Sequence, residues 1–155
     1  MDVYRISSAL YIKDLTGLGP KTYGGRWNYR GVPAIYTSET RALAGLEFLV
    51  HVKTRKSDNL KIATISIPGS IAPLEFRIET LPKGWRAHPP PVKLAEMGGD
   101  WLKSLKSLLL RVPSAVIPNE VNLIINPMHA DVKHVRISHV EDFTFDKRLH
   151  PEDIK

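Results

Sequence analysis

Apolar and polar positions alternate in short runs along much of the chain, and this period of two predicts a set of short strands. Several runs end at breakers, such as Pro68-Gly69 after one strand and Asn126-Pro127 after another. The run at 108–112 is apolar throughout, which is typical of a strand buried on both faces. The predicted strands span residues 3–6, 32–36, 60–67, 108–112, 121–125 and 134–140.

Two longer segments have helical periodicity instead. The first runs from about Glu39 to Val52, with Thr37 or Ser38 as its cap. The second runs from about 94 to 107, with Gly98-Gly99 interrupting its start and Asp100 as a candidate cap. Segments 17–25 and 68–93 are rich in glycine or proline and are predicted to be irregular. Because strands and helices do not alternate regularly, we expect an α+β domain with short mixed strands and two main helices.

Glu47 interrupts the apolar face of the first helix. It lies on the stripe of Leu43, Leu46 and Val50 that should face the core. Glutamate is almost never fully buried unless it is paired, and isolating its charge would cost several kcal/mol or raise its pKa. Glu47 is therefore either one half of a structural ion pair, with Arg26 or Arg5, or a carboxylate that lines a pocket.

The loop Gly24-Gly25-Arg26-Trp27-Asn28 contains a second group of candidate ligand-binding side chains. Its two glycines allow the backbone to approach a ligand closely, and the Arg26 guanidinium suits bidentate contact with phosphate or carboxylate. The loop does not match the usual nucleotide-phosphate motifs. Tyr36, at the end of a predicted strand, is either a stacking platform or a packed ring. The functional interpretation depends on whether Arg26, Tyr36 and Glu47 converge.

Composition narrows the class of protein. A chain of 155 residues with 43% hydrophobic and 25% charged residues suits one domain, here 1–155. The absence of cysteine excludes disulfides and thiolate metal sites, and no histidine motif supports a metal. No apolar segment approaches the roughly 20 residues of a membrane span, and we see no signal peptide. We expect a cytoplasmic protein with no membrane association.

The net charge is +6, and residues 1–60 supply +4 of it through nine Lys or Arg against five Asp or Glu. Such a field favours an anionic partner, which could be a phosphorylated ligand, nucleic acid or an acidic protein, unless it serves solubility alone. The basic residues are scattered, so a nucleic-acid arm is not indicated.

A hydrolase triad of Ser114, His129 and Asp131 has little support. The chain has no G-x-S-x-G elbow around Ser114. His129 and Asp131 share one short loop, which rarely gives the geometry between base and orienting acid.

Taken in order, these residues resemble the RES-domain family, the toxin half of RES–Xre toxin–antitoxin pairs. The family is named after an arginine, a glutamate and a serine, which here are Arg26 in Gly-Gly-Arg-Trp-Asn, Glu47 in Ala-Gly-Leu-Glu and Ser114 in Arg-Val-Pro-Ser. The resemblance covers essentially the whole chain, and its further matches include Tyr4-Arg5, Ile35-Tyr36-Thr37-Ser38, Gly99-Asp100-Trp101-Leu102, Asn126-Pro127 with His129, and Phe145-Asp146-Lys147-Arg148-Leu149.

The resemblance implies a single RES-like domain with a fold similar to ADP-ribosyltransferase toxins. It also implies a toxin that depletes NAD⁺, as a glycohydrolase or phosphorylase that cleaves the nicotinamide–ribose bond. NAD⁺ would then be a substrate rather than a cofactor, and no metal would be needed because nicotinamide is already a good leaving group. The implied partner is an Xre-type helix-turn-helix antitoxin that occludes the active site, so direct nucleic-acid binding by this chain is not expected.

For NAD⁺ cleavage, the expected catalytic residues are Glu47, Arg26 and Tyr36. Glu47 would stabilise the positive charge of an oxocarbenium-like transition state or hold a ribose hydroxyl. Arg26, with Arg5, would grip the pyrophosphate, and Tyr36 would stack on nicotinamide or its ribose. The remaining expected substrate-binding residues are Asn28, Ser114, Asn126 and His129. Two alternatives remain open: a protein ADP-ribosyltransferase that uses the same pocket, and a non-enzymatic basic binding module.

Overall fold

Seven strands form one sheet in the order β4-β5-β6-β2-β1-β3-β7 in the computed structural model, which describes residues 1–51 and 59–149. All pairings are antiparallel except the one between β4 and β5. The strands are β1 (Asp2–Ser8), β2 (Ile35–Ser38), β3 (Leu60–Ser66), β4 (Leu74–Glu75), β5 (Leu109–Pro113), β6 (Val121–Ile125) and β7 (Arg136–Asp142).

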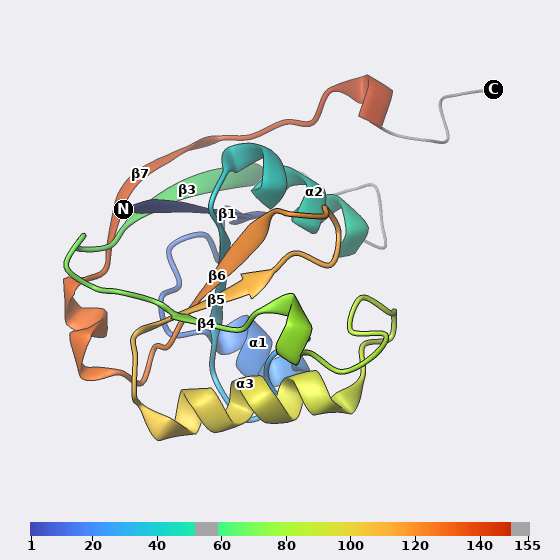
Figure 1. Cartoon of the computed structure of the whole chain (residues 1–155). Coiled ribbons are helices and arrows are strands. Elements are labelled where there is room, and N and C mark those ends of the chain that lie inside the picture. Colours follow the sequence, from blue (N-terminus) through green and yellow to red (C-terminus); the bar gives the residue numbers. More distant parts are fainter. Residues whose placement is uncertain (52–58, 150–155) are drawn as a thin grey trace.

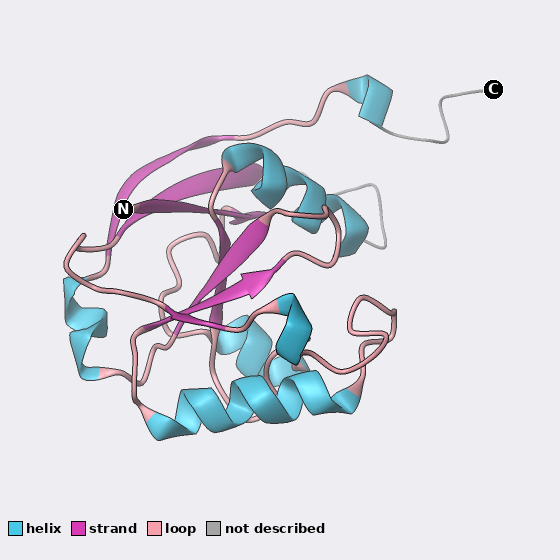
Figure 2. Cartoon of the chain, in the orientation of Figure 1, coloured by secondary structure: helices cyan, strands magenta, loops and turns pink. Residues whose placement is uncertain are grey.

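Three α-helices and three short 3₁₀ segments accompany the sheet (Figure 2). The α-helices are α1 (Leu18–Tyr23), α2 (Arg41–His51) and α3 (Val92–Ser104), and the 3₁₀ segments are η1 (Ile78–Thr80), η2 (Ala130–His134) and η3 (Lys147–Leu149). In Figure 1, α2 lies in the upper half of the molecule, below the end of β7, and α3 runs along the bottom, with β4, β5 and β6 between the two helices. In the described part of the chain, no helix is long and apolar enough to cross a membrane.

The predicted α+β class is confirmed, and each predicted strand is present within three residues of its expected bounds. One α-helix and one strand, besides the short 3₁₀ segments, were not predicted. The α1 helix lies in the glycine-rich segment that we expected to be irregular, where Pro20 is tolerated because it falls in the first helical turn. The two-residue strand β4 lies in the proline-rich segment, and such a short run carries no periodic signal.

Both main helices are present and begin within two residues of their predicted starts, but their predicted caps were wrong. Thr37 and Ser38 belong to β2, and the Thr40 hydroxyl instead accepts a hydrogen bond from the Leu43 N–H at 3.1 Å at the start of α2. Along the apolar stripe Leu43 is buried, but Val50 is 60% exposed. The predicted last residue of this helix, Val52, lies outside the described residues.

Gly98 and Gly99 lie in the interior of α3 and do not interrupt it, so Asp100 is not its cap. Gly98 is needed there for packing rather than for a turn. A Cβ added at Gly98 would lie 2.1 Å from the carbonyl oxygen of Trp27, closer than real Cβ atoms approach anything. The glycine therefore lets the α3 backbone rest directly on the loop that carries Arg26.

One face of the sheet is covered by a continuous apolar core. Side chains alternate between faces along each strand, which brings residues such as Val3, Ile35 and Ile125 together on this face. Ile12, in the loop after β1, and Val135, just before β7, pack against them.

The opposite face carries two separate apolar clusters. Helix α3 packs Leu94 and Trp101 over one of them, which includes Ile124 of β6. Helix α2 packs Ala44 over the other, which includes Ile62 of β3. Between the two clusters lies a polar strip formed by the hydrogen-bonded side chains of Ser38, Glu47, Ser114 and Asn122. It contains two of the predicted site residues, Glu47 and Ser114.

We predict that Gly98→Ala destabilises the protein by about 2 kcal/mol, because overpacking typically costs about 1–3 kcal/mol and here the neighbour is backbone that cannot rotate away. Urea unfolding measures this change. The matched control is Gly19→Ala in α1, where an added Cβ meets nothing within 4 Å. Equal unfolding free energies for the two variants would contradict the packing role of Gly98.

Candidate functional site

The carboxylate of Glu47 lies at the centre of the polar strip. One of its oxygens, Oε1, accepts two hydrogen bonds, from the Ser114 hydroxyl at 2.7 Å and from the Asn122 side-chain amide at 2.5 Å. None of the residues that the structure describes donates to the other oxygen, Oε2, and Glu47 is only partly buried. One oxygen is thus fixed, while the other has no hydrogen-bond donor among the described residues.

The sheet register explains why these polar groups meet. Tyr4 of β1 pairs with Ser38 of β2, and Ser38 pairs with Asn122 of β6. The three side chains therefore form a row across neighbouring strands on one face. The Ser38 hydroxyl donates to the Asn122 oxygen at 2.7 Å, which leaves the Asn122 amide directed at Glu47.

Ser114 is held from both sides. It follows β5 directly, and its hydroxyl oxygen accepts hydrogen bonds from the Val116 and Ile117 N–H groups, each at 3.1 Å. With both acceptor positions used by the backbone, the single hydroxyl proton is committed to Glu47. Ser114 thus fixes the position of the carboxylate on α2 relative to the end of β5.

Tyr36 lies on the same face as Ser38, two residues earlier in β2. Its hydroxyl donates to Asn28 Oδ1 at 2.8 Å and accepts from the Trp27 N–H at 2.9 Å. Burial of this hydroxyl raises the pKa of Tyr36, while the Trp27 N–H and the Arg26 charge oppose the rise. A Cβ at Gly25 would lie 2.6 Å from the hydroxyl oxygen, so the glycine permits this close approach.

Asn28 supports the tyrosine through a buried side chain. It is 1% exposed, and its amide donates to the carbonyl oxygens of Pro20, Tyr29 and Val32. Its direct contact with substrate stays a prediction. Asn28 ties the glycine-rich loop to Tyr36.

Arg26 bridges this loop to the segment after η1. Its guanidinium donates to the carbonyl oxygens of Trp85 at 2.5 Å and Ala87 at 3.3 Å. Burial lowers the pKa of Arg26, and the negative charge of Glu47 opposes that shift. Arg26 and Glu47 therefore lie near enough to interact, although no salt bridge joins them among the described residues.

Two predicted ligand contacts, Arg5 and Asn126, lie away from Glu47. Arg5 projects from β1 to the opposite face and donates to the carbonyl oxygens of Tyr11 and Ile12, the latter at 2.5 Å. The Asn126 amide is fully buried and donates to the Leu102 carbonyl at 2.8 Å. Both side chains thus donate hydrogen bonds to backbone carbonyl oxygens and do not contact Glu47.

His129 caps the start of η2, where its Nδ1 accepts from the Asp131 N–H at 3.1 Å. The Ser114 hydroxyl is committed to Glu47, so it does not join His129 and Asp131 in a triad. The predicted role of His129 in the pocket wall has no support in this arrangement.

Asn122 and Ser38 were not predicted as site residues. The available signal was a polar residue inside the apolar run Val-Asn-Leu-Ile-Ile of β6. That signal does not show on which face of the sheet Asn122 lies or which side chain it contacts. Both depend on the pairing of β6 with β2, where Ser38 is 84 positions away in the sequence.

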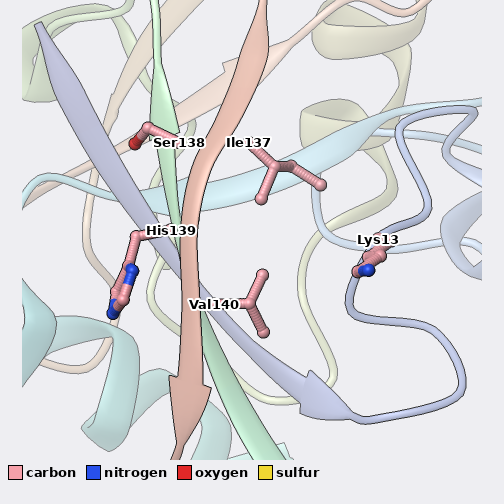
Figure 3. A pocket seen from close by; sticks show the side chains of 5 residues that line it. All are labelled: Lys13, Ile137, Ser138, His139 and Val140. Carbon is pink, nitrogen blue, oxygen red and sulfur yellow. The ribbon is translucent and has the colours of Figure 1, made fainter.

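Two hollows on the part of the surface that the structure describes differ in chemistry. The larger, about 400 Å³, lies along the edge strand β7 and is lined by Lys13, Ile137, Ser138, His139 and Val140. Figure 3 shows Ile137 and Val140 directed toward Lys13, with Ser138 and His139 on the other side of the strand. None of the predicted site residues lines it. The second, about 250 Å³, is lined in part by Arg26.

Groups of three or more His, Cys, Asp or Glu that could hold a metal ion do not occur among residues 1–51 and 59–149. The absence of a metal from the reaction stays a prediction.

Comparison with known proteins places the chain in a family. The model of the RES domain matches residues 2–146. A protein named Toxin Res from Yersinia enterocolitica is 39% identical over 96% of this chain and 99% of its own length. A protein named Prs ADP-ribosylating toxin from a Sphingobium species is 38% identical over 88% of this chain and 86% of its own length.

A solved structure, the MbcT–MbcA toxin–antitoxin complex of M. tuberculosis, contains a chain with the same fold. The two superpose with a TM-score of 0.65 and 19% identity, over 92% of this chain and 84% of the other. The family match over nearly the whole chain, together with relatives at 38–39% identity, shows that this protein belongs to the RES-domain family.

Proposed function

We propose that this protein is the toxin of a toxin–antitoxin pair and that it depletes NAD⁺ by cleaving the nicotinamide–ribose bond. The observation that carries the proposal is the Glu47 carboxylate, whose Oε1 is fixed by Ser114 and Asn122 while Oε2 is open to a ligand. Relatives named as toxins support the biological role.

Cleavage places positive charge on the ribose. The glycosidic bond at ribose C1′ breaks, and its electron pair leaves with neutral nicotinamide. The ribose is left as an oxocarbenium-like centre, and an oxygen of the acceptor then bonds to C1′ and releases its proton. A fixed carboxylate nearby lowers the free energy of this charge, and costs little reorganisation because its position is already set. We assign this role to Glu47, through Oε2.

The neighbours of Glu47 suit the rest of the dinucleotide. Arg26 can exchange its carbonyl partners, Trp85 and Ala87, for a pyrophosphate oxygen, which is a stronger, charge-assisted acceptor. The ring of Tyr36 is partly exposed although its hydroxyl is buried, so a ring face can contact nicotinamide or ribose. Ser114 and Asn122 act as positioning residues.

Transfer of ADP-ribose to a protein is the second candidate. It is favoured by the 38% identity to a relative named Prs ADP-ribosylating toxin. Both reactions need the same bond cleavage and the same charge stabilisation, and they differ only in the acceptor.

We propose an antitoxin as partner, by analogy with the solved complex of a toxin of this fold with its antitoxin. An Xre-type helix-turn-helix protein that covers the Glu47 site is the partner that the RES-family resemblance implies. The excess of basic residues in the first 60 positions suits an acidic segment of such a partner.

We predict that Glu47→Gln lowers the rate of NAD⁺ loss roughly 100- to 1,000-fold, the usual cost of removing one electrostatic group that stabilises a transition state. The amide preserves the shape of the side chain, so the fold should be unchanged by circular dichroism. The matched control is Glu39→Gln, which removes a carboxylate paired with Arg111 outside the polar strip and should keep the wild-type rate. Wild-type turnover by folded Glu47→Gln would sink the assignment.

We expect NAD⁺ labelled in its adenine ring to yield labelled small molecules rather than labelled protein. The purified protein would be incubated with this NAD⁺ in a cell extract, with and without inorganic phosphate, and the products separated by size. Free ADP-ribose identifies water as the acceptor, and a phosphorylated form identifies phosphate. Label on macromolecules alone would overturn the proposal in favour of protein ADP-ribosylation, and no loss of NAD⁺ would overturn both.

A further inference from the structure

The second hollow is a groove that the proposed chemistry at Glu47 does not use. It has a volume of about 250 Å³ and lies between the glycine-rich loop and the start of α3. Its walls are rings and apolar groups, contributed by Tyr23, Tyr29, Pro90, Pro91 and Val92. Tyr23 is 76% exposed and Val92 is 65% exposed, so the groove presents unusually large apolar groups to solvent.

The charges around the groove favour an anion. Arg26 and Arg30 both line it, and no acidic residue does. Two acids, Glu96 and Asp100, lie farther along α3 outside the lining. Glu96 is paired with Lys93 at 3.1 Å, and burial together with the charges of Glu96 and Asp100 raises the pKa of Tyr29. A ligand for this groove should therefore combine a flat ring, which suits tyrosine, with negative charge, which suits arginine.

Arg26 connects the groove to the Glu47 site, because it lines the groove and also lies within electrostatic reach of Glu47. A molecule that spans both places must pass the Arg26 guanidinium. The size of the groove also limits its occupant. Pockets that enclose a drug-sized ligand measure roughly 300–1,000 Å³, so 250 Å³ suits part of a dinucleotide and not the whole.

We infer that this groove binds the adenosine half of the dinucleotide, with the adenine base stacked on the ring of Tyr23 and the phosphates at Arg26 and Arg30. This inference rests on the proposed function, since it takes NAD⁺ as the substrate. The groove then binds the adenosine phosphate half of NAD⁺, and Glu47 stabilises the charge that develops on the nicotinamide ribose.

The test compares two substrates that contain the same scissile bond. Nicotinamide mononucleotide keeps the nicotinamide–ribose bond and lacks the adenosine half. Stacking of a base on an aromatic side chain contributes enough that its removal weakens binding roughly 5- to 100-fold. We expect Tyr23→Ala to raise the KM for NAD⁺ by this factor with little change in kcat, and to leave the kinetics of nicotinamide mononucleotide unchanged.

Two further variants separate stacking from structural damage. Tyr23→Phe keeps the ring and should restore the wild-type KM. Tyr11→Ala removes a tyrosine that is 57% exposed and lies outside the groove, and it should leave both substrates unaffected. An unchanged KM for NAD⁺ in Tyr23→Ala, or an equal rise for both substrates, would overturn the adenosine assignment.

Direct binding of ADP separates failure of the inference from failure of the proposed function, because it needs no cleavage. Calorimetry should show that ADP binds the wild-type protein and binds Tyr23→Ala roughly 5- to 100-fold more weakly. If ADP binds in this way but NAD⁺ is never cleaved, the adenosine-binding inference is supported and the proposed NAD⁺ cleavage is contradicted. If NAD⁺ is cleaved but wild type and Tyr23→Ala bind ADP with the same affinity, the adenosine-binding inference is contradicted and the proposed function is supported.

Discussion

The hydrogen bonds from Ser114 and Asn122 to one oxygen of Glu47 are the interaction on which the site depends. They join three elements that are far apart in the sequence: α2, the end of β5 and the face of β6. A carboxylate on a helix would otherwise be free to choose among rotamers, and a half-buried charge needs such partners to be tolerated. By satisfying one oxygen only, the two donors hold the carboxylate in place and keep its other oxygen available.

A second network holds the glycine-rich loop 24–28 against the sheet. Tyr36 bonds to both Asn28 and Trp27, and the carbonyl of Trp27 rests on Gly98 of α3. The position of Arg26, which lies between Gly25 and Trp27, is therefore set by β2 on one side and by α3 on the other. The packing of α3 against this loop thus helps to set the geometry of the site.

The sequence predicted the fold class, six of the seven strands and the two larger helices, because those elements carry clear periodicity. It also singled out Glu47, since an acid on an apolar stripe is conspicuous. It could not reveal Asn122, because a single polar residue in a strand becomes meaningful only when the register with Ser38 is known. For the same reason it could not show that the Arg5 side chain lies on the other face of the sheet from Ser38.

The central claim is that Oε2 of Glu47 meets the nicotinamide ribose while Oε1 stays bonded to Ser114 and Asn122. The most direct measurement is a crystal structure of the protein with a carbocyclic NAD⁺ analogue, in which a methylene group replaces the ring oxygen of that ribose and prevents cleavage. The account predicts a hydroxyl of the carbocycle about 2.5–3.0 Å from Oε2, a normal hydrogen-bond distance, with both existing bonds to Oε1 retained. An analogue bound with its carbocycle away from Glu47 would contradict the account.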